Sequence, residues 1–174
     1  GVKSLSQIEK HVAYPMVMKP VYGAVSYFVV KVENRKDAEE TYDYIKSNIK
    51  TNWLAPEWEN FDLLVEEYID GDEVDIDIIL QNGKIKFYSI SDNFNKTHER
   101  FFLDSGQAIP SGLPERDQKK LIDCAEETIE KLGIRDGIIH FEAKISKDVV
   151  YPIEANLRMG GDYIYSYLKG AWGV

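Results

Sequence analysis

Residues 153–158, IEANLR, are the most informative part of this chain when they are taken together with residues 141–144, FEAK. In a β-strand, successive side chains point to opposite faces of the sheet. Glu154, Asn156 and Arg158 therefore share one face if residues 153–158 form a strand. The two stretches predict neighbouring strands that present carboxylate, amide and guanidinium groups close together.

A short polar turn at residues 146–148 separates the two stretches and predicts a β-hairpin. If the apolar residues of both strands are buried on one side of the hairpin, the numbers of paired residues must sum to an even value. This register sets Glu142 opposite, or diagonally near, Glu154. The apolar residues are Ile139, Phe141, Ala143 and Ile145 in the first strand and Tyr151, Ile153, Ala155 and Leu157 in the second.

Two facing carboxylates with Cβ atoms roughly 5 Å apart repel each other, and a shared proton or a bound cation relieves the repulsion. Glu142, Glu154 and the Asn156 carbonyl supply hard oxygen ligands, which favours Mg²⁺ with phosphate oxygens completing its shell. Lys144 shares a face with Glu142, so it could pair with that carboxylate or reach a phosphate. The alternative interpretation is an amphipathic hairpin with a solvated polar face.

The composition indicates a soluble globular protein. With 174 residues, 44% of them hydrophobic, the chain can bury one substantial core or fold as two small lobes. A formal net charge of −9 argues against nucleic acid and anionic membranes as partners, because either needs a basic face. A single cysteine, Cys124, and the lack of a signal peptide predict a cytoplasmic location.

Hydrophobic periodicity and turn residues predict both helices and strands. Helices are expected at 4–12, 34–50, 114–132 and after Gly160-Gly161. Strands are expected at 15–18, 27–32, 63–69, 73–80 and 84–90, besides the two strands that carry Glu142 and Glu154. The Asn82-Gly83 dipeptide predicts a hairpin turn, and residues 92–110 are expected to form a long irregular loop.

Lys19 ends an apolar strand, where a bare ammonium is costly unless an anion such as phosphate pairs with it. The following turn, residues 23–26, has small residues that let backbone N–H groups approach phosphate oxygens. A lysine whose ammonium simply reaches solvent is the competing interpretation.

Residues 66–69, EEYI, indicate a strand that ends in a linker. Its unpaired backbone N–H and C=O groups can hydrogen-bond the edge of an adenine, while a carboxylate accepts from the adenine amino group. Glu73, a few residues further on, can hold ribose hydroxyls. An edge strand with a charged, solvated end is the alternative.

Four motifs in order resemble the ATP-grasp superfamily. They are YPMVMKP at 14–20, EEYIDGDE at 66–73, Glu142, and IEANLRMGG at 153–161. The segment AIPSGLP at 108–114, with residues 137–144, is similar to the carboxylate–amine (amino-acid) ligase branch that includes carnosine synthase. The resemblance spans nearly the whole chain.

The resemblance implies an α+β ATP-grasp fold, in which two small lobes with antiparallel sheets clamp a nucleotide. We expect the lobes at residues 1–69 and 70–174, the second carrying the metal site. The chain is expected to be truncated at both ends relative to a full ligase, whose N-terminal substrate domain is expected to belong to the same protein outside this chain.

The resemblance also implies roles for individual residues. ATP is expected to contact Lys19, Ser26, Glu66, Glu67, Tyr68, Ile69 and Glu73, and Mg²⁺, or Mn²⁺, is expected to bind Glu142, Glu154 and Asn156. Arg158 and Lys144 are expected to act in catalysis, with Arg158 stabilising charge at the acyl centre. His98 and Arg100 are expected to close over the triphosphate.

The implied activity is ATP-dependent ligation of a carboxylate and an amine through an acyl phosphate, on amino acids or small peptides. A purine-biosynthesis or carbamoyl-phosphate-type enzyme is a second interpretation. A non-catalytic nucleotide-binding module is a third, because Tyr27 and Phe28 follow Ser26 where the family commonly has Gly two residues after the Ser. The chain alone is expected to bind nucleotide without full ligase activity.

Overall fold

The computed structural model divides the chain into two compact units, and each is described by itself. The first unit runs to Tyr68 and includes Phe101 and Phe102, and the second comprises Ile69–Asn95 and the chain from Asp104 onward. The described residues are 4–49, 62–95, 101–102, 104–161 and 163–173. The lobe boundary expected between residues 69 and 70 stays a prediction.

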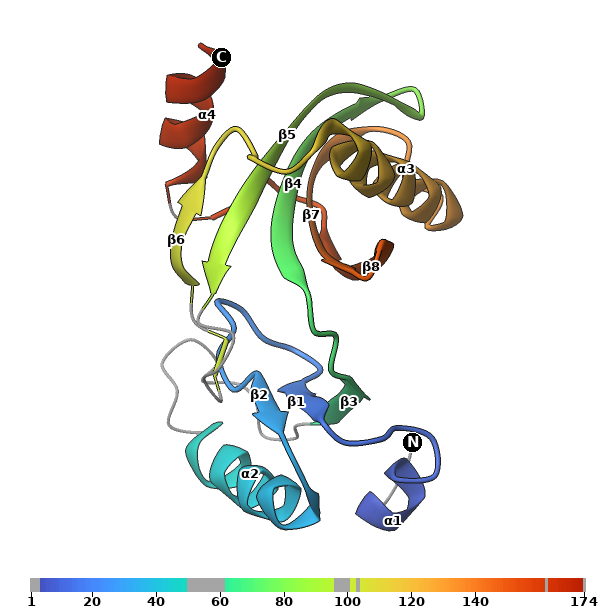
Figure 1. Cartoon of the computed structure of the whole chain (residues 1–174), viewed down its shortest axis with the longest axis vertical. Helices are drawn as coiled ribbons and strands as arrows, with labels where there is room; N and C mark the ends of the chain where they lie inside the picture. Colours follow the sequence, from blue (N-terminus) through green and yellow to red (C-terminus); the bar gives the residue numbers. More distant parts are fainter. Residues whose placement is uncertain (1–3, 50–61, 96–100, 103, 162, 174) are drawn as a thin grey trace. The chain divides into compact units, whose positions relative to one another are not determined.

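The first unit is a three-stranded antiparallel sheet in the order β2-β1-β3, with helices packed on it (Figure 1). Its strands are β1 Met16–Pro20, β2 Val30–Val32 and β3 Leu63–Glu67, and its helices are α1 Leu5–Ile8 and α2 Arg35–Asn48. Met16, Met18 and Val30 are buried in one core with Ala38 of α2. Because side chains alternate along a strand, Lys19 lies on the opposite face.

The second unit is a five-stranded antiparallel sheet in the order β6-β5-β4-β7-β8. Its strands are β4 Asp72–Gln81, β5 Lys84–Asn95, β6 Asp104–Ala108, β7 Gly137–Ser146 and β8 Val149–Asn156. Helix α3, Glu115–Lys131, packs Leu121 and Ile129 against one face of the sheet, where Ile90 is also buried. Helix α4, Ile164–Trp172, lies on the other face, where Trp172 Nε1 donates to Ser89 Oγ at 2.9 Å. Antiparallel sheets with packed helices confirm the predicted α+β class.

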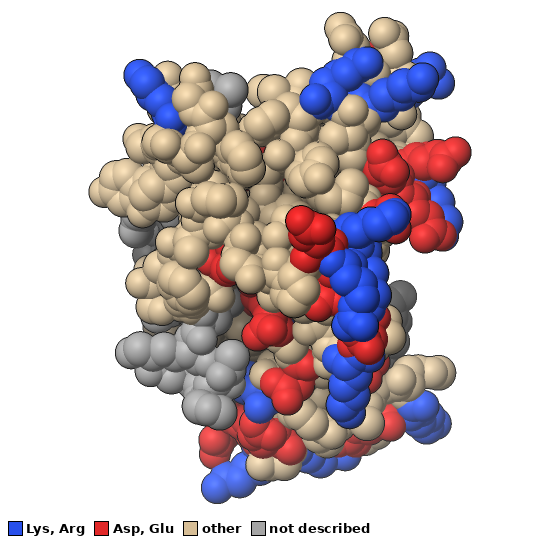
Figure 2. All heavy atoms as spheres, turned by 45° about the horizontal axis from the view of Figure 1, so that its top comes forward, with Lys and Arg blue, Asp and Glu red and all other residues tan. Residues whose placement is uncertain are grey.

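Charges of both signs are interleaved on the outer face of α3. Lys119 pairs with Asp123 at 2.7 Å and Lys131 with Glu127 at 2.6 Å, each one helical turn apart. Figure 2 shows positive and negative side chains next to each other on its right-hand side, where α3 lies in Figure 1. This helix therefore presents a mixed, salt-bridged surface. None of the helices formed by the described residues is long and apolar enough to span a membrane.

The alternation of β4 and the turn that follows it are confirmed. Val74, Ile76 and Ile78 lie in the core that α3 covers. Asn82 and Gly83 have φ of 53° and 71°, as a two-residue hairpin turn of the favoured kind requires. Asp75 and Asp77, which alternate with these core residues, therefore point to the opposite face of the sheet, on which α4 lies.

Strands β5 and β6 extend into residues where an irregular loop was expected. That expectation was wrong for residues 92–95 and 104–108, which are paired strand residues. Polar residues are frequent here, which is typical of a loop, but two of them bond across the sheet: Gln107 Nε2 donates to Asn93 Oδ1 at 3.0 Å. Other elements are shorter than predicted: the first helix ends at Ile8, the second strand begins only at Val30, and the strand expected at 63–69 ends at Glu67.

Strands β7 and β8 are joined by a two-residue turn, not by the three-residue turn that was expected. Lys147 and Asp148 have φ of 48° and 68° and connect the paired residues Ser146 and Val149. A two-residue turn makes the numbers of paired residues sum to an odd value. On that register alone, Glu142 would face an apolar residue of β8.

A β-bulge at Ile153 shifts the register by one residue. Ala143 pairs with Pro152, whereas Glu142 pairs with Glu154, so Ile153 is the extra residue on β8. Proline lacks an N–H group and is found in sheets at bulges and edges, which suits Pro152 to this place. Beyond the bulge the pairing sums are even, and the prediction that Glu142 faces Glu154 is confirmed.

The bulge also changes which side chains of β8 reach the core. Val150 and Ala155 pack against the core beneath α3. Tyr151 pairs with Lys144, which belongs to the polar face, and Leu157 is 70% exposed after the end of the strand. The prediction that Tyr151 and Leu157 are buried with the core was therefore wrong.

Leucine-to-alanine substitutions at two positions test this assignment of the core. We expect Leu121→Ala, at a fully buried site, to lower the free energy of unfolding by about 2–5 kcal/mol. Leu157→Ala should change it by less than about 0.5 kcal/mol, because that side chain is mostly in water. Urea denaturation of both variants measures the difference, and equal losses would place Leu157 in the core after all.

Candidate functional site

Three carboxylates lie side by side at one level of the five-stranded sheet. Asp75 of β4 pairs with Glu142 of β7, and Glu142 pairs with Glu154 of β8, so all three share the face opposite α3. Burial, together with the neighbouring charges of Asp75 and Glu154, raises the pKa of Glu142 to about 7, against a lowering by His140. The row therefore holds more negative charge than its surroundings stabilise.

His140 lies one level further along the same face. Its Nδ1 is 3.2 Å from Asp77 Oδ1, and its Nε2 is 3.7 Å from Glu142 Oε1 and 3.9 Å from Asp75 Oδ2. Burial lowers the pKa of His140, but the hydrogen bond to Asp77 and the charges of Asp75, Asp77 and Glu142 raise it, and the net direction is upward. When protonated, the imidazole offsets part of the negative charge of the carboxylate row.

Two amide side chains, from β5 and β6, donate hydrogen bonds to Asp75. Asn93 Nδ2 donates to Asp75 Oδ1 at 2.9 Å, and Gln107 Nε2 donates to Asp75 Oδ2 at 2.7 Å. These three residues and His140 were not predicted as site residues from the sequence. The i, i+2 spacing of His140 and Glu142 was a usable signal, whereas Asn93 and Gln107 fell in the segment expected to be a loop.

The polar face also holds buried polar atoms without a partner among the described residues: Asp77 Oδ2, Ser91 Oγ and Asn156 Nδ2. Asn156 pairs with His140 across β7 and β8, so its side chain lies on the face of the carboxylate row. Two facing carboxylates, one with a raised pKa, fit a divalent cation, and the carbonyl oxygen of Asn156 is a further possible ligand, whereas its unpartnered Nδ2 can only donate to an acceptor. Among the described residues no three His, Cys, Asp or Glu side chains cluster as metal ligands, so a cation here needs the Asn156 carbonyl and oxygens from outside the chain.

Lys144 and Glu73 form an ion pair on this face. They are cross-strand partners of β7 and β4, and Lys144 Nζ is 3.1 Å from Glu73 Oε2. Both side chains are largely buried, at 10% and 17% exposed. Lys144, which is expected to act in catalysis, thus directly contacts Glu73, which is expected to hold ribose.

Arg158 follows the end of β8. Its side chain is exposed, and its Nη1 donates to the carbonyl of the next residue, Met159, at 2.9 Å. Two residues further on, the backbone N–H of Gly160 donates to Asp77 Oδ1 at 2.8 Å. The segment that carries Arg158 therefore returns to the polar face of the sheet immediately after this residue.

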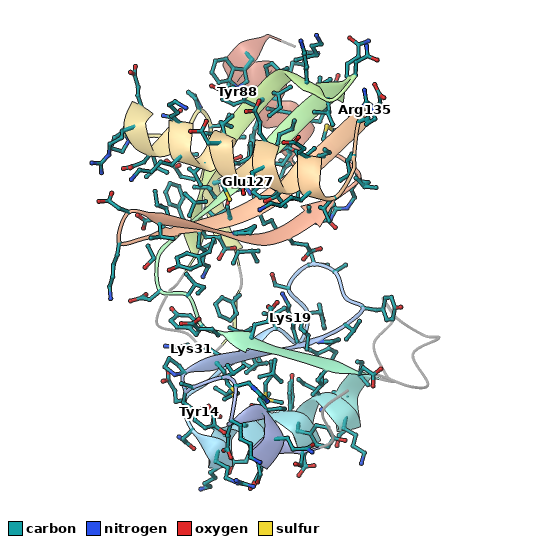
Figure 3. The ribbon with its side chains drawn as sticks, turned by 90° about the vertical axis from the view of Figure 1, so that its right-hand side faces the viewer. Tyr14, Lys19, Lys31, Tyr88, Glu127 and Arg135 are labelled. Carbon is teal, nitrogen blue, oxygen red and sulfur yellow. The ribbon has the colours of Figure 1, made fainter. Side chains whose placement is uncertain are left out.

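The first unit carries a second group of expected site residues. Lys19 lies on the side of the three-stranded sheet away from α1 and α2 (Figure 3), and its Nζ is 2.6 Å from Glu66 Oε2. The sequence predicted that Lys19 needs an anionic partner, and Glu66 is such a partner. Glu67, the last residue of β3, pairs with Met16 of β1. The N–H of the next residue, Tyr68, donates to the carbonyl of Pro15 at 3.3 Å.

The turn before β2 explains the aromatic residue that departs from the expected phosphate loop. Val25, Ser26 and Phe28 have φ of 54°, 53° and 62°, the left-handed region that glycine adopts most easily. Phe28 is buried against Ile45 of α2 and Ile49, the residue that follows this helix. The backbone therefore takes a glycine-like conformation here, while the side chain fills the core of the first unit.

The structure groups the expected site residues by unit. Lys19, Ser26, Glu66, Glu67 and Tyr68 lie in the first unit, and Ile69, Glu73, Glu142, Lys144, Glu154, Asn156 and Arg158 lie in the second. His98 and Arg100 lie outside the described residues.

The chain belongs to the ATP-grasp domain family, which it matches over residues 12–166. Among proteins of known sequence it is similar to carnosine synthase 1 of Gallus gallus, with 30% identity over 166 residues, 93% of this chain and 18% of that protein. It is also similar to alanine–anticapsin ligase of Bacillus subtilis strain 168, with 25% identity over 180 residues, 95% of this chain and 37% of that protein.

A solved structure agrees with this assignment. The L-amino acid ligase from Bacillus licheniformis matches with a TM-score of 0.80 and 28% identity, over 98% of this chain and 41% of that one. The predicted ATP-grasp fold is confirmed. The chain spans about a fifth of the length of the carnosine synthase that it matches and about two fifths of that of the two bacterial ligases.

The raised pKa of Glu142 predicts a pH-dependent stability. The folded chain holds this proton up to a pH of about 7, against 4.5 for an ordinary Glu, so ionisation costs stability as the pH rises through that window. We expect Glu142→Gln to be more stable than the parent chain at pH 8 by on the order of 2 kcal/mol, and equally stable near pH 4. Urea denaturation at both pH values measures this.

Glu130→Gln is the matched control, because Glu130 lies on the exposed side of α3. It should change the free energy of unfolding by less than about 0.5 kcal/mol at either pH. Equal stabilities of Glu142→Gln and the parent chain at pH 8 would contradict the raised pKa.

Proposed function

We propose that this chain is the nucleotide-binding and catalytic part of an ATP-dependent carboxylate–amine ligase, which forms an amide through an acyl phosphate. The observation that carries the proposal is the facing pair Glu142 and Glu154, which the bulge at Ile153 brings to one face in a member of the ATP-grasp domain family. Similarity to carnosine synthase and to two bacterial amino-acid ligases supports amino acids or small peptides as substrates.

Glu142, Glu154 and Asn156 are the residues that would hold Mg²⁺, or Mn²⁺. A divalent cation bound there supplies charge neutralisation for phosphoryl transfer. The negative charges of Asp75 and Glu154 raise the pKa of Glu142, and His140 offsets part of that charge. This excess of negative charge would favour a bound cation. The backbones that carry these side chains belong to three paired strands, β4, β7 and β8, which sets their spacing before a cation binds.

The first unit and the segment that follows it would hold ATP. Lys19 and Ser26 would contact phosphate oxygens, and the chain from β3 into Tyr68 and Ile69 would bind adenine through Glu66, Glu67 and backbone groups. Glu73 would hold ribose hydroxyls. Its ion pair with Lys144, at 3.1 Å, supports a shared role in orienting the nucleotide.

In a ligation of this kind the substrate carboxylate attacks the γ-phosphorus of ATP, and the bond to the β–γ bridging oxygen breaks to give an acyl phosphate and ADP. The amine nitrogen then attacks the acyl carbon, inorganic phosphate leaves, and the amine loses a proton to give the amide. Arg158 would stabilise the oxyanion of this second step through its guanidinium. Lys144 would contribute a second positive charge beside the carboxylate row.

The organisation of the whole protein follows the same proposal. Residues 1–69 and 70–174 would form the two lobes of the ligase's ATP-grasp part, and a further domain of the same protein would bind the carboxylate substrate. A purine-biosynthesis or carbamoyl-phosphate-type activity is the alternative within the superfamily. ADP release that depends on an added amino acid and amine would favour the ligase over a module that only binds nucleotide.

Calorimetric titration with ATP, with and without Mg²⁺, tests the proposed site on this chain. We expect Mg²⁺-dependent ATP binding that weakens at least about tenfold in the Glu142→Ala/Glu154→Ala double variant, because charge-assisted cation ligands are lost. The control is Glu126→Ala/Glu130→Ala, which removes two exposed carboxylates of α3 and should bind as the parent chain does. Equal Mg²⁺-dependent affinities in all three proteins would contradict the assigned cation site.

A further inference from the structure

Asp77 joins three separate segments of the second unit. It lies on β4 and is 3% exposed, and its Oδ1 accepts from the backbone N–H of Gly160 at 2.8 Å. The same oxygen is 3.2 Å from His140 Nδ1 on β7. Because a carboxylate oxygen only accepts, Nδ1 carries the hydrogen in this contact. We call these two hydrogen bonds to Oδ1 the Asp77 anchor.

Gly160 approaches the His140 ring so closely that no other residue fits without movement. A Cβ at Gly160 would lie 2.9 Å from His140 Nδ1 and 2.9 Å from Ile164 Cγ1. A Cβ at the next residue, Gly161, would meet nothing within 4 Å. The backbone of Gly160 therefore packs directly against the imidazole. Gly160 has no room for a side chain, whereas Gly161 does.

The anchor closes a short loop around Arg158. On one side, Asn156 is held by its pairing with His140 at the end of β8. On the other side, Gly160 is held by Asp77 and lies against the same His140. Only three residues lie between these fixed points, and Arg158 is the middle one. Its backbone position is thus determined even though its side chain is exposed.

A purely structural role would not require a carboxylate at this position. Burying one is unfavourable unless hydrogen bonds satisfy it, and Asp77 Oδ2 is buried with no partner among the described residues. The carboxylate is explained by what it accepts: the Gly160 N–H and the histidine that faces Glu142.

We propose that Asp77 is a positioning residue, which fixes the backbone of Arg158 through Gly160 and fixes the His140 ring beside Glu142. The role of Arg158 in the chemistry rests on the proposed ligase function. The placement of its backbone does not, so the two can be tested separately.

Amide hydrogen exchange measured by NMR on this chain tests the placement. In Asp77→Ala, we expect the Gly160 amide to exchange at least about tenfold faster, while the core amide of Phe141 stays within about threefold of the parent chain. Asp77→Asn keeps an acceptor oxygen and should restore most of the protection. Unchanged Gly160 exchange, or equal acceleration at Phe141, would overturn the proposal.

Alanine at the two glycines provides a matched pair for turnover. In the full enzyme with ATP, Mg²⁺, an amino acid and an amine, Gly160→Ala and Asp77→Ala should lower kcat at least about tenfold with KM for ATP within about threefold. Gly161→Ala should keep both values. A raised KM for ATP with an unchanged kcat would overturn the positioning role. Absence of any turnover in the parent enzyme would instead refute the ligase function, and the exchange measurement would still decide the placement.

Discussion

Electrostatic repulsion among Asp75, Glu142 and Glu154 is the constraint on which the rest of the second unit depends. Carboxylates on three neighbouring strands at one level of a sheet are unfavourable unless each is compensated. The compensation comes from the whole width of the sheet: β5 and β6 supply amide donors to Asp75, and β7 supplies His140. Glu142 is the member left with a raised pKa, which makes it the natural position for an added cation.

One extra residue produces this arrangement. The alternation of apolar residues correctly predicted that Glu142 and Glu154 face each other, together with the α+β class and the β4–β5 hairpin. It did not predict the two-residue turn or the bulge, because Ile153 is apolar and fits the pattern whether or not it is paired. Two errors therefore cancelled at Glu142, while Tyr151 and Leu157 were assigned to the wrong environment.

The parts of the site that were missed depend on contacts between segments distant in sequence. Asp77, His140 and Gly160 meet only because β4 and β7 are paired in one register and the chain after β8 folds back over them. No local pattern contains that information. In the first unit, similarly, the sequence indicated that Lys19 needs an anion, but only the register of β1 and β3 identifies Glu66 as a partner.

The most direct test of the central claim is a crystal structure of this chain grown with Mn²⁺ and a non-hydrolysable ATP analogue, with the metal located by its anomalous scattering. We predict a metal peak within coordination distance of carboxylate oxygens from both Glu142 and Glu154, with phosphate oxygens completing the shell. Bound nucleotide whose metal contacts neither glutamate would contradict the assignment of this polar face as the cation site.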